Sequence, residues 1–178
     1  MVHSQLPVRT FLDRSIVALF SEHGEWIVEG QAPVEGGAAF SNEELSDLNA
    51  LRSIFAVNER AGFQFITAEA SIAPRANDSD VFWPTQLSVI SDELLATDGP
   101  TSESRARSQL LDAATYDWIE QANRIAVRYA LLTRCDAYMT TDRELVTQAS
   151  AFSDSIGLRF FTPVGYWGLL QPWARLWV

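Results

Sequence analysis

The chain has 178 residues, of which 47% are hydrophobic, 11% aromatic and 20% charged. This composition excludes a disordered chain, because a disordered chain buries too little apolar surface to offset the entropy lost on ordering. The 23 acidic residues outnumber the 13 basic residues and give a formal charge of −10, which argues against a broad basic face for duplex nucleic acid.

The first elements expected along the chain are a strand and a helix. Residues 8–12 (VRTFL) are rich in strand-forming side chains and end on Asp13, and residues 15–20 (SIVALF) have helical character. Residues 24–31 alternate weakly between apolar and polar side chains, which predicts an edge strand or a surface hairpin. Residues 33–37, which contain proline and glycine, predict a loop.

A capping box marks the start of the next helix. Ser41 is followed three residues later by Glu44, and large apolar side chains then recur every three or four residues until the helix is expected to end near Gly62. Residues 63–67 (FQFIT) predict a second strand, which leads into a further helical turn. Residues 74–84 are irregular and polar, which indicates a surface segment.

Helical patterns dominate the middle of the chain. Residues 86–95 indicate a short helix, and residues 98–104 (DGPTSES) indicate a break. Helical spacing then runs almost without interruption over residues 104–134, although Asp117 followed by Glu120 offers a second capping box within that stretch.

The last predicted elements complete a sheet. Residues 137–140 and 158–162 predict a third and a fourth strand, with a short helix over residues 142–149 between them. Strands that are separated by helices favour an α/β fold with a parallel sheet and right-handed crossovers.

Acidic residues follow three of the predicted strands: Asp13, Glu69 and Asp142. The carboxyl ends of parallel strands share one edge of a sheet, where ligands bind. Grouped carboxylates repel one another unless a cation neutralises them, and oxygen ligands without histidine or cysteine select Mg²⁺ or Mn²⁺. Such a centre suits phosphodiester hydrolysis. Taken singly, Asp13 and Asp142 have an alternative role as N-caps of the helices that follow them.

Four segments carry a resemblance to a known family. Residues 8–15 (VRTFLDRS) are similar to a strand that ends in Asp-x-Ser, and residues 63–72 (FQFITAEASI) are similar to a segment with a second acid. Residues 123–145 (NRIAVRYALLTRCDAYMTTDREL) are similar to a helix and a strand closed by Thr-x-Asp, and residues 160–173 to a last strand and a Pro-led helix. Together the segments resemble the PIN domain family of metal-dependent ribonucleases.

The resemblance implies a fold for the whole chain. It predicts a single three-layer α/β/α domain over residues 1–178, built around a mostly parallel sheet of four to five strands. Residues 24–37 and 74–104 are not covered by the resemblance and are expected to be insertions.

The resemblance also implies a set of metal ligands. Asp13, Glu69 and Asp142 become the catalytic acids and ligands of Mg²⁺ or Mn²⁺. Asn123 stands where the family usually has a third aspartate, and its amide oxygen can bind a metal but adds no charge. Asp117 and Glu120 are acids that could compensate. Glu120 lies one turn before Asn123 on almost the same helical face, whereas Asp117 is favoured as an N-cap.

Hydroxyl and guanidinium groups near these acids have two possible roles. The hydroxyls of Ser15 and Thr140 are expected to orient ligands or a water molecule. Arg124 and Arg143 can hold a phosphate bidentately or can neutralise neighbouring carboxylates. Arg14 and Arg128 carry the same two alternatives.

The function expected from this pattern is that of a PIN-type ribonuclease, the toxin of a toxin–antitoxin pair. Its partners would be an RNA substrate and an antitoxin protein, and it is expected to be a cytoplasmic homodimer without a membrane segment. The alternative is a catalytically degraded domain that binds RNA or protein, which Asn123 favours. A phosphatase or another α/β enzyme stays open as well, because carboxylates at strand ends do not specify a substrate.

Overall fold

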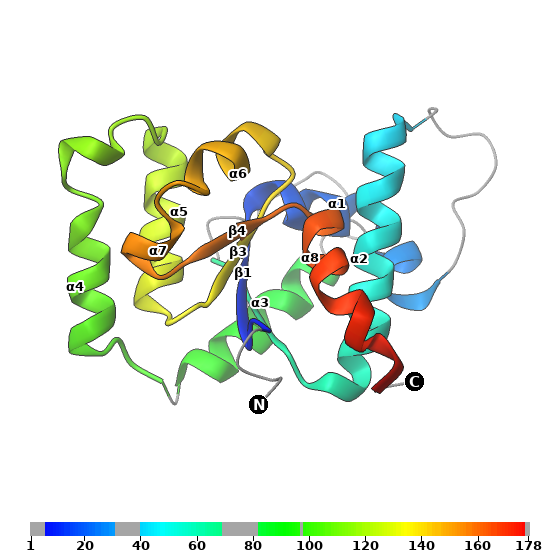
Figure 1. The fold of residues 1–178 in the computed structure, drawn as a ribbon. Helices are drawn as coiled ribbons and strands as arrows, with labels where there is room; N and C mark the ends of the chain where they lie inside the picture. The colour runs from blue at the N-terminus through cyan, green and yellow to red at the C-terminus, as the bar shows by residue number, and fades with distance from the viewer. Residues whose placement is uncertain (1–5, 31–39, 69–81, 97, 177–178) are drawn as a thin grey trace.

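A parallel sheet forms the centre of the fold. The computed structural model describes residues 6–30, 40–68, 82–96 and 98–176. Its four described strands are all parallel and lie in the order β2-β1-β3-β4 (Figure 1). The strands are β1 (Arg9–Leu12), β2 (Gln64–Ile66), β3 (Ala137–Met139) and β4 (Arg159–Phe161). The predicted α/β fold with a parallel sheet is therefore confirmed.

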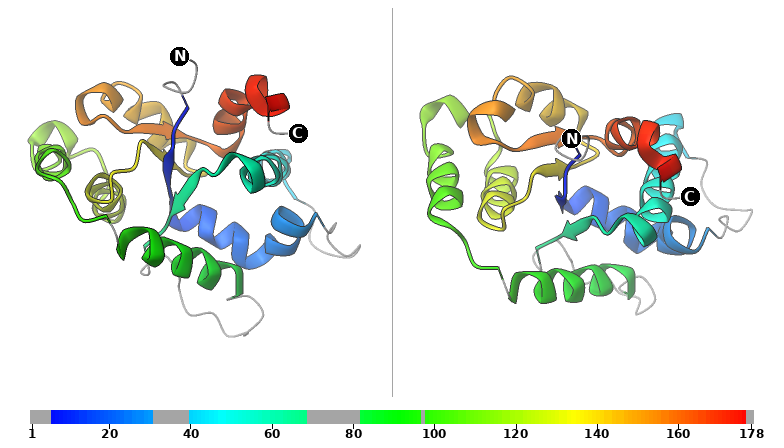
Figure 2. Two further views of the ribbon diagram at one scale, coloured as in Figure 1. Left: turned by 90° about the horizontal axis from the view of Figure 1, so that it is seen from below. Right: turned by 60° about the horizontal axis from the view of Figure 1, so that its bottom comes forward.

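Helices connect the strands and pack on both faces of the sheet (Figures 1 and 2). This arrangement is compatible with a three-layer α/β/α fold. The α-helices are α1 (Arg14–Gly24), α2 (Asn42–Ala61), α3 (Phe82–Ala96), α4 (Ser102–Leu110), α5 (Gln121–Leu132), α6 (Arg143–Ala149), α7 (Ser153–Ile156) and α8 (Pro163–Leu170). The other helical segments are η2 (Glu25–Glu29), η5 (Ala114–Tyr116) and η6 (Gln171–Leu176).

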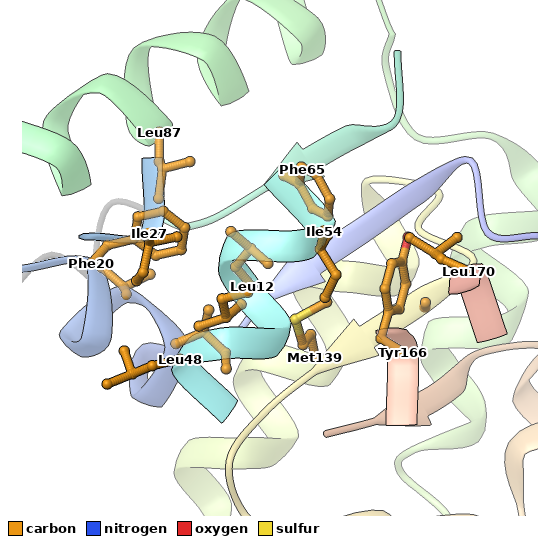
Figure 3. Packing of buried hydrophobic residues seen from close by; sticks show 14 of the residues in the cluster. Leu12, Phe20, Ile27, Leu48, Ile54, Phe65, Leu87, Met139, Tyr166 and Leu170 are labelled. Atoms are coloured by element: carbon orange, nitrogen blue, oxygen red, sulfur yellow. The ribbon is translucent and has the colours of Figure 1, made fainter. Parts of the chain in front are cut away.

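Two hydrophobic cores lie on opposite faces of the sheet because successive strand side chains point to opposite sides. Figure 3 shows the one beside α2, which we call the α2-side core. Its buried residues are Leu6, Leu12, Ile16, Val17, Phe20, Ile27, Leu48, Leu51, Ile54, Phe65, Leu87, Ala137, Met139, Tyr166 and Leu170. The α5-side core contains Phe11, Ile66, Leu111, Tyr116, Ile119, Val127, Ala130, Leu131, Cys135, Tyr138, Leu145, Ala149, Ile156, Leu158 and Phe160.

The predicted capping box is present at the start of α2. The Ser41 hydroxyl accepts a hydrogen bond from the Glu44 amide (3.2 Å), and the Glu44 carboxylate accepts one from the Ser41 amide (2.9 Å). The helix ends at Gly62, whose left-handed backbone (φ 69°) favours glycine. Both ends of this helix were thus predicted from local side-chain chemistry.

Several sequence predictions were wrong. Residues 25–29 form a π-helical turn rather than a strand or hairpin, because Ile27 packs into the α2-side core while Gly30 ends the turn with φ 71°. Residues 82–84 belong to α3 rather than to an irregular segment, and α4 begins within the predicted break at residues 98–104. The predicted loop at residues 33–37 lies outside the described residues.

The long helix expected over residues 104–134 is divided into α4, η5 and α5. Leu111, Tyr116 and Ile119 turn into the α5-side core between these helices, so apolar spacing continued where the helix did not. The predicted N-cap role of Asp117 is wrong, because Asp117 follows η5 and Glu120 occupies the N-cap position of α5 without a side-chain cap hydrogen bond. Within the described part of the chain, no helix is both long and apolar enough to cross a membrane.

Candidate metal centre

Asp13 and Asp142 lie at the same edge of the sheet. Asp13 directly follows β1, and Asp142 follows the neighbouring strand β3, with Leu12 paired to Met139 at the ends of the two strands. The Asp13 amide donates a hydrogen bond to the Met139 carbonyl (3.0 Å), which continues the ladder by one residue. The parallel topology thus brings two of the three predicted acids to one edge.

The hydroxyl of Thr140 connects these two acids. It is fully buried and donates a 2.7 Å hydrogen bond to Asp13 Oδ2. The same hydroxyl oxygen accepts a hydrogen bond from the Asp142 amide (3.1 Å). One side chain therefore fixes the carboxylate of the first acid and the backbone of the second.

Ser15 provides a second connection across the edge. Its hydroxyl donates to Asp13 Oδ2 (3.2 Å) and accepts a hydrogen bond from the Thr141 amide (3.0 Å). Ser15 Oγ also lies 3.3 Å from Thr140 Oγ1. The two hydroxyls expected to orient groups at this site thus both contact Asp13.

Both acids also cap helices, as the alternative interpretation predicted. Asp13 Oδ1 accepts from the Arg14 amide at the start of α1 (2.6 Å), and Asp142 Oδ1 accepts from the Leu145 amide at the start of α6 (2.9 Å). Asp13 is buried, whereas Asp142 is exposed. A carboxylate has about four acceptor positions, so capping leaves each group able to bind a further ligand.

Asn123 lies in the first turn of α5. The helix packs against β3 and leads into its amino end, so the beginning of α5 lies toward the carboxyl edge of the sheet (Figure 1). Asn123 shares a helical face with Val127 and Ala130, which are buried in the α5-side core. Among the described residues, Asn123 makes no hydrogen bond to Asp13 or Asp142.

The other predicted acids are not part of this arrangement as far as the structure describes it. Asp117 is exposed and pairs with Arg124 (3.3 Å), and Glu120 is exposed. Glu69 lies outside the described residues. Within those residues, no three histidine, cysteine, aspartate or glutamate side chains group closely enough to hold a metal ion.

Three of the four arginines near the acids have carboxylate partners. Arg124 donates a hydrogen bond to the Tyr116 carbonyl (3.1 Å) and forms an ion pair with Asp117. Arg128 forms an ion pair with Asp112, and Arg143 forms one with Asp47. For these arginines the alternative role, neutralising neighbouring carboxylates, is the one that the structure contains. Arg14 is exposed at the start of α1.

Arg143 spans a small pocket beside the two acids. Its guanidinium donates to Asp47 Oδ2 (3.1 Å) and to the Thr141 carbonyl (3.3 Å), and it lies 3.7 Å from Glu43. The pocket has a volume of about 240 Å³. It is lined by Ser15, Leu19, Ser41, Glu43, Glu44, Asp47, Thr141 and Arg143.

Sequence reasoning missed Asp47, which is almost completely buried on α2. Burial raises the pKa of its carboxyl above the usual range, and the charge of Arg143 opposes this shift. A signal was present in the sequence, because Asp47, Leu51 and Ile54 are spaced by four and three residues and so share the buried face of the helix. An acid at a core position of an amphipathic helix indicates a buried ion pair.

Sequence reasoning also missed Tyr138, in the middle of β3. The residue is fully buried, and its hydroxyl has no hydrogen-bond partner among the described residues. Burial raises the pKa of this phenol well above its ordinary value, and the negative charges of Asp13 and Asp142 raise it further. The sequence signal is a polar-tipped residue two positions before Thr140, on the same face of the strand.

The chain was compared with models of protein families, with curated proteins and with solved structures, and none of them matches it. The interpretation of the site therefore rests on the residues and their geometry.

Proposed function

We propose that this protein is a metal-dependent phosphodiester hydrolase, a ribonuclease of the PIN type. The observation that carries the proposal is the connection of Asp13 and Asp142 through the buried hydroxyl of Thr140, at the carboxyl edge of two neighbouring parallel strands. Hydroxyl donors directed at one carboxylate hold it in a fixed orientation, as a metal ligand requires.

The donor set fits a hard divalent cation. Mg²⁺ is usually held by one or two carboxylates and retains several water molecules. Asp13 and Asp142 would supply the two carboxylates, the Asn123 amide would complete the set, and Glu69 is the proposed further acid. The orphaned hydroxyl of buried Tyr138 is a further sign that a polar ligand belongs here. When bound, Mg²⁺ or Mn²⁺ supplies an activated water and neutralises charge on the phosphate.

An RNA substrate agrees with the distribution of charge. A chain of formal charge −10 does not attract a duplex along a broad face, but a cation at one edge would create a local site for a single phosphate group. Arg14 is exposed beside Asp13, and its charge acts on Tyr138. We assign Arg14 to contact with the substrate phosphate, because Arg124, Arg128 and Arg143 have carboxylate partners.

The biological setting belongs to the same proposal. The resemblance to PIN domains favours a toxin of a toxin–antitoxin pair, with a small antitoxin partner, a homodimeric state and a cytoplasmic location. The antitoxin would bind the chain and suppress cleavage.

A second candidate function is a binding module without activity. One observation favours it: the Asn123 amide supplies no charge to a metal centre. Such a module would bind RNA or protein through the same fold without retaining a divalent cation.

Cleavage and metal binding separate the two functions. A panel of RNAs is incubated with Mn²⁺ and the wild-type chain, Asp13→Asn or Asp142→Asn, and Mn²⁺ binding is measured by calorimetry. We expect cleavage by the wild type that EDTA abolishes, and a loss of at least about 100-fold in each variant. Asp154→Asn, at an exposed acid on α7, is the matched control and keeps full activity. RNA binding without Mn²⁺ binding would support the binding module instead.

A further inference from the structure

The Tyr138 hydroxyl occupies an unusual position for a buried polar group. Its oxygen is buried and has no hydrogen-bond partner among the described residues. A buried hydroxyl without a partner is costly, and in native proteins it marks a water molecule, an ion or a functional role. The position of this hydroxyl therefore indicates a role beyond packing in the core.

The surroundings of the ring fix the direction of the side chain. The Tyr138 ring lies between Phe11, on β1, and Phe160, on β4, with ring centroids 5.3 Å away in both cases. These three residues are neighbours across the sheet and face the α5-side core. Aromatic packing on both sides restricts the ring, so the hydroxyl is held in place.

The same face of the sheet carries the candidate metal centre. Strand side chains alternate, so Thr140 lies on the face of Tyr138, and Asp13 lies on the face of Phe11, two residues further along. The hydrogen bond from Thr140 to Asp13 (2.7 Å) confirms that these groups meet on that face. Burial raises the pKa of the phenol, and the negative charges of Asp13 and Asp142 raise it further.

We propose that Tyr138 is a positioning residue of the metal centre: its hydroxyl accepts a hydrogen bond from a water molecule of the cation's hydration shell. This inference rests on the proposed function. Asp13 Oδ2 already accepts from Ser15 and Thr140, whereas Oδ1 accepts only from the Arg14 amide among the described residues. Oδ1 thus keeps an acceptor position for the cation, and the water gives the phenol oxygen its missing donor.

The Tyr138→Phe variant isolates this hydroxyl. It keeps the ring and its packing between Phe11 and Phe160, and it removes a hydroxyl that has no hydrogen-bond partner among the described residues, so we expect it to fold. Tyr129→Phe is the matched control. Tyr129 also packs against Phe11, with ring centroids 5.9 Å apart. The pKa of its phenol is raised by burial and then by Asp92 and Cys135, not by Asp13 or Asp142.

Calorimetric titration with Mn²⁺ is the first measurement. We expect Tyr138→Phe to bind Mn²⁺ about tenfold more weakly than the wild type, as is usual when a group that supports a metal ligand is removed, and Tyr129→Phe to bind it equally well. Equal affinity of Tyr138→Phe and the wild type would overturn the role of Tyr138 while leaving the metal centre intact. A wild-type chain that binds no Mn²⁺ would overturn the proposed function, and this inference with it.

A second measurement follows Tyr138 in the wild-type chain. The chain contains four tyrosines, and biosynthetic 3-fluorotyrosine gives each a ¹⁹F resonance, with that of Tyr138 assigned by its absence from Tyr138→Phe. We expect Mg²⁺ to shift the Tyr138 resonance in the wild type and to leave it unchanged in Asp142→Asn. A Tyr138 resonance that stays in place while Mg²⁺ binds would contradict the proposal.

Discussion

The hydroxyl of Thr140 is the group whose removal tests the site geometry most directly. Thr140→Val keeps the size and the branching of the side chain but removes the donor to Asp13 and the acceptor for the Asp142 amide. A hydrogen bond to a charged group contributes about 1.5–3 kcal/mol. The Asp142 amide loses its partner at a partly exposed position, which costs about 1 kcal/mol. We therefore expect the free energy of unfolding to fall by about 3 kcal/mol.

Urea denaturation at pH 7, followed by circular dichroism, measures this change, with Thr140→Ser as the matched control. The serine variant retains the hydroxyl and loses one buried methyl group, which costs about 1 kcal/mol. A double-mutant cycle with Asp13→Asn then isolates the Thr140–Asp13 interaction, for which we expect a coupling of at least about 1 kcal/mol. If Thr140→Val is no less stable than Thr140→Ser, the hydroxyl does not hold the two acids and the site geometry is wrong.

Two further predictions concern Asp47, which lines the pocket beside Arg143, and Gly24, where α1 closely approaches α3. Burial raises the pKa of Asp47, so its carboxyl binds a proton at a higher pH in the folded state than in the unfolded state. As the pH falls from 7 toward about 4, the unfolding free energy of the wild type, measured by urea denaturation, should therefore increase relative to that of Asp47→Asn. An unchanged difference between the two proteins over that range would contradict the assignment. A Cβ at Gly24 would lie 1.9 Å from the Trp83 ring, so Gly24→Ala should lower the unfolding free energy by about 1–3 kcal/mol. Gly168→Ala, in the open on α8, should raise it by about 0.5–1 kcal/mol, and thermal unfolding that moves both variants in the same direction would refute this account.

The elements that were predicted correctly have signals confined to a few neighbouring residues. The capping box at Ser41 and the apolar runs of the four strands specify their own local structure. The prediction of one helix over residues 104–134 was wrong because apolar side chains continue at helical spacing through the turns between α4 and α5. The spacing indicates which side chains are buried, but a side chain in a turn can be buried in the core as well as one in a helix. Only the path of the chain across the sheet separates the two cases.

The candidate site was predictable to the extent that it depends on strand ends. Asp13 and Asp142 were identified because a parallel sheet brings the ends of its strands to one edge, and Ser15 and Thr140 because they adjoin those acids. Asp47 could not be placed in the same way, since its partner Arg143 is 96 residues away and on another element. Tyr138 was missed for a different reason: a tyrosine in an apolar strand is usually a core residue, and only its unpartnered hydroxyl distinguishes it.

The helix-capping role of Asp13 and Asp142 and their proposed role as metal ligands support one another physically. A helix N-terminus carries unpaired amides, and a capping carboxylate that accepts from them is therefore held in a fixed direction. A divalent cation requires such an oriented ligand, because a mobile carboxylate loses entropy when it binds the ion. Since β1 leads through Asp13 alone into α1 and β3 leads through three residues into α6, the same chain turns that end the strands also orient both carboxylates. Capping at these two positions is thus no argument against a metal centre. The charge missing at Asn123 is the stronger objection, and Mn²⁺ affinity measures it.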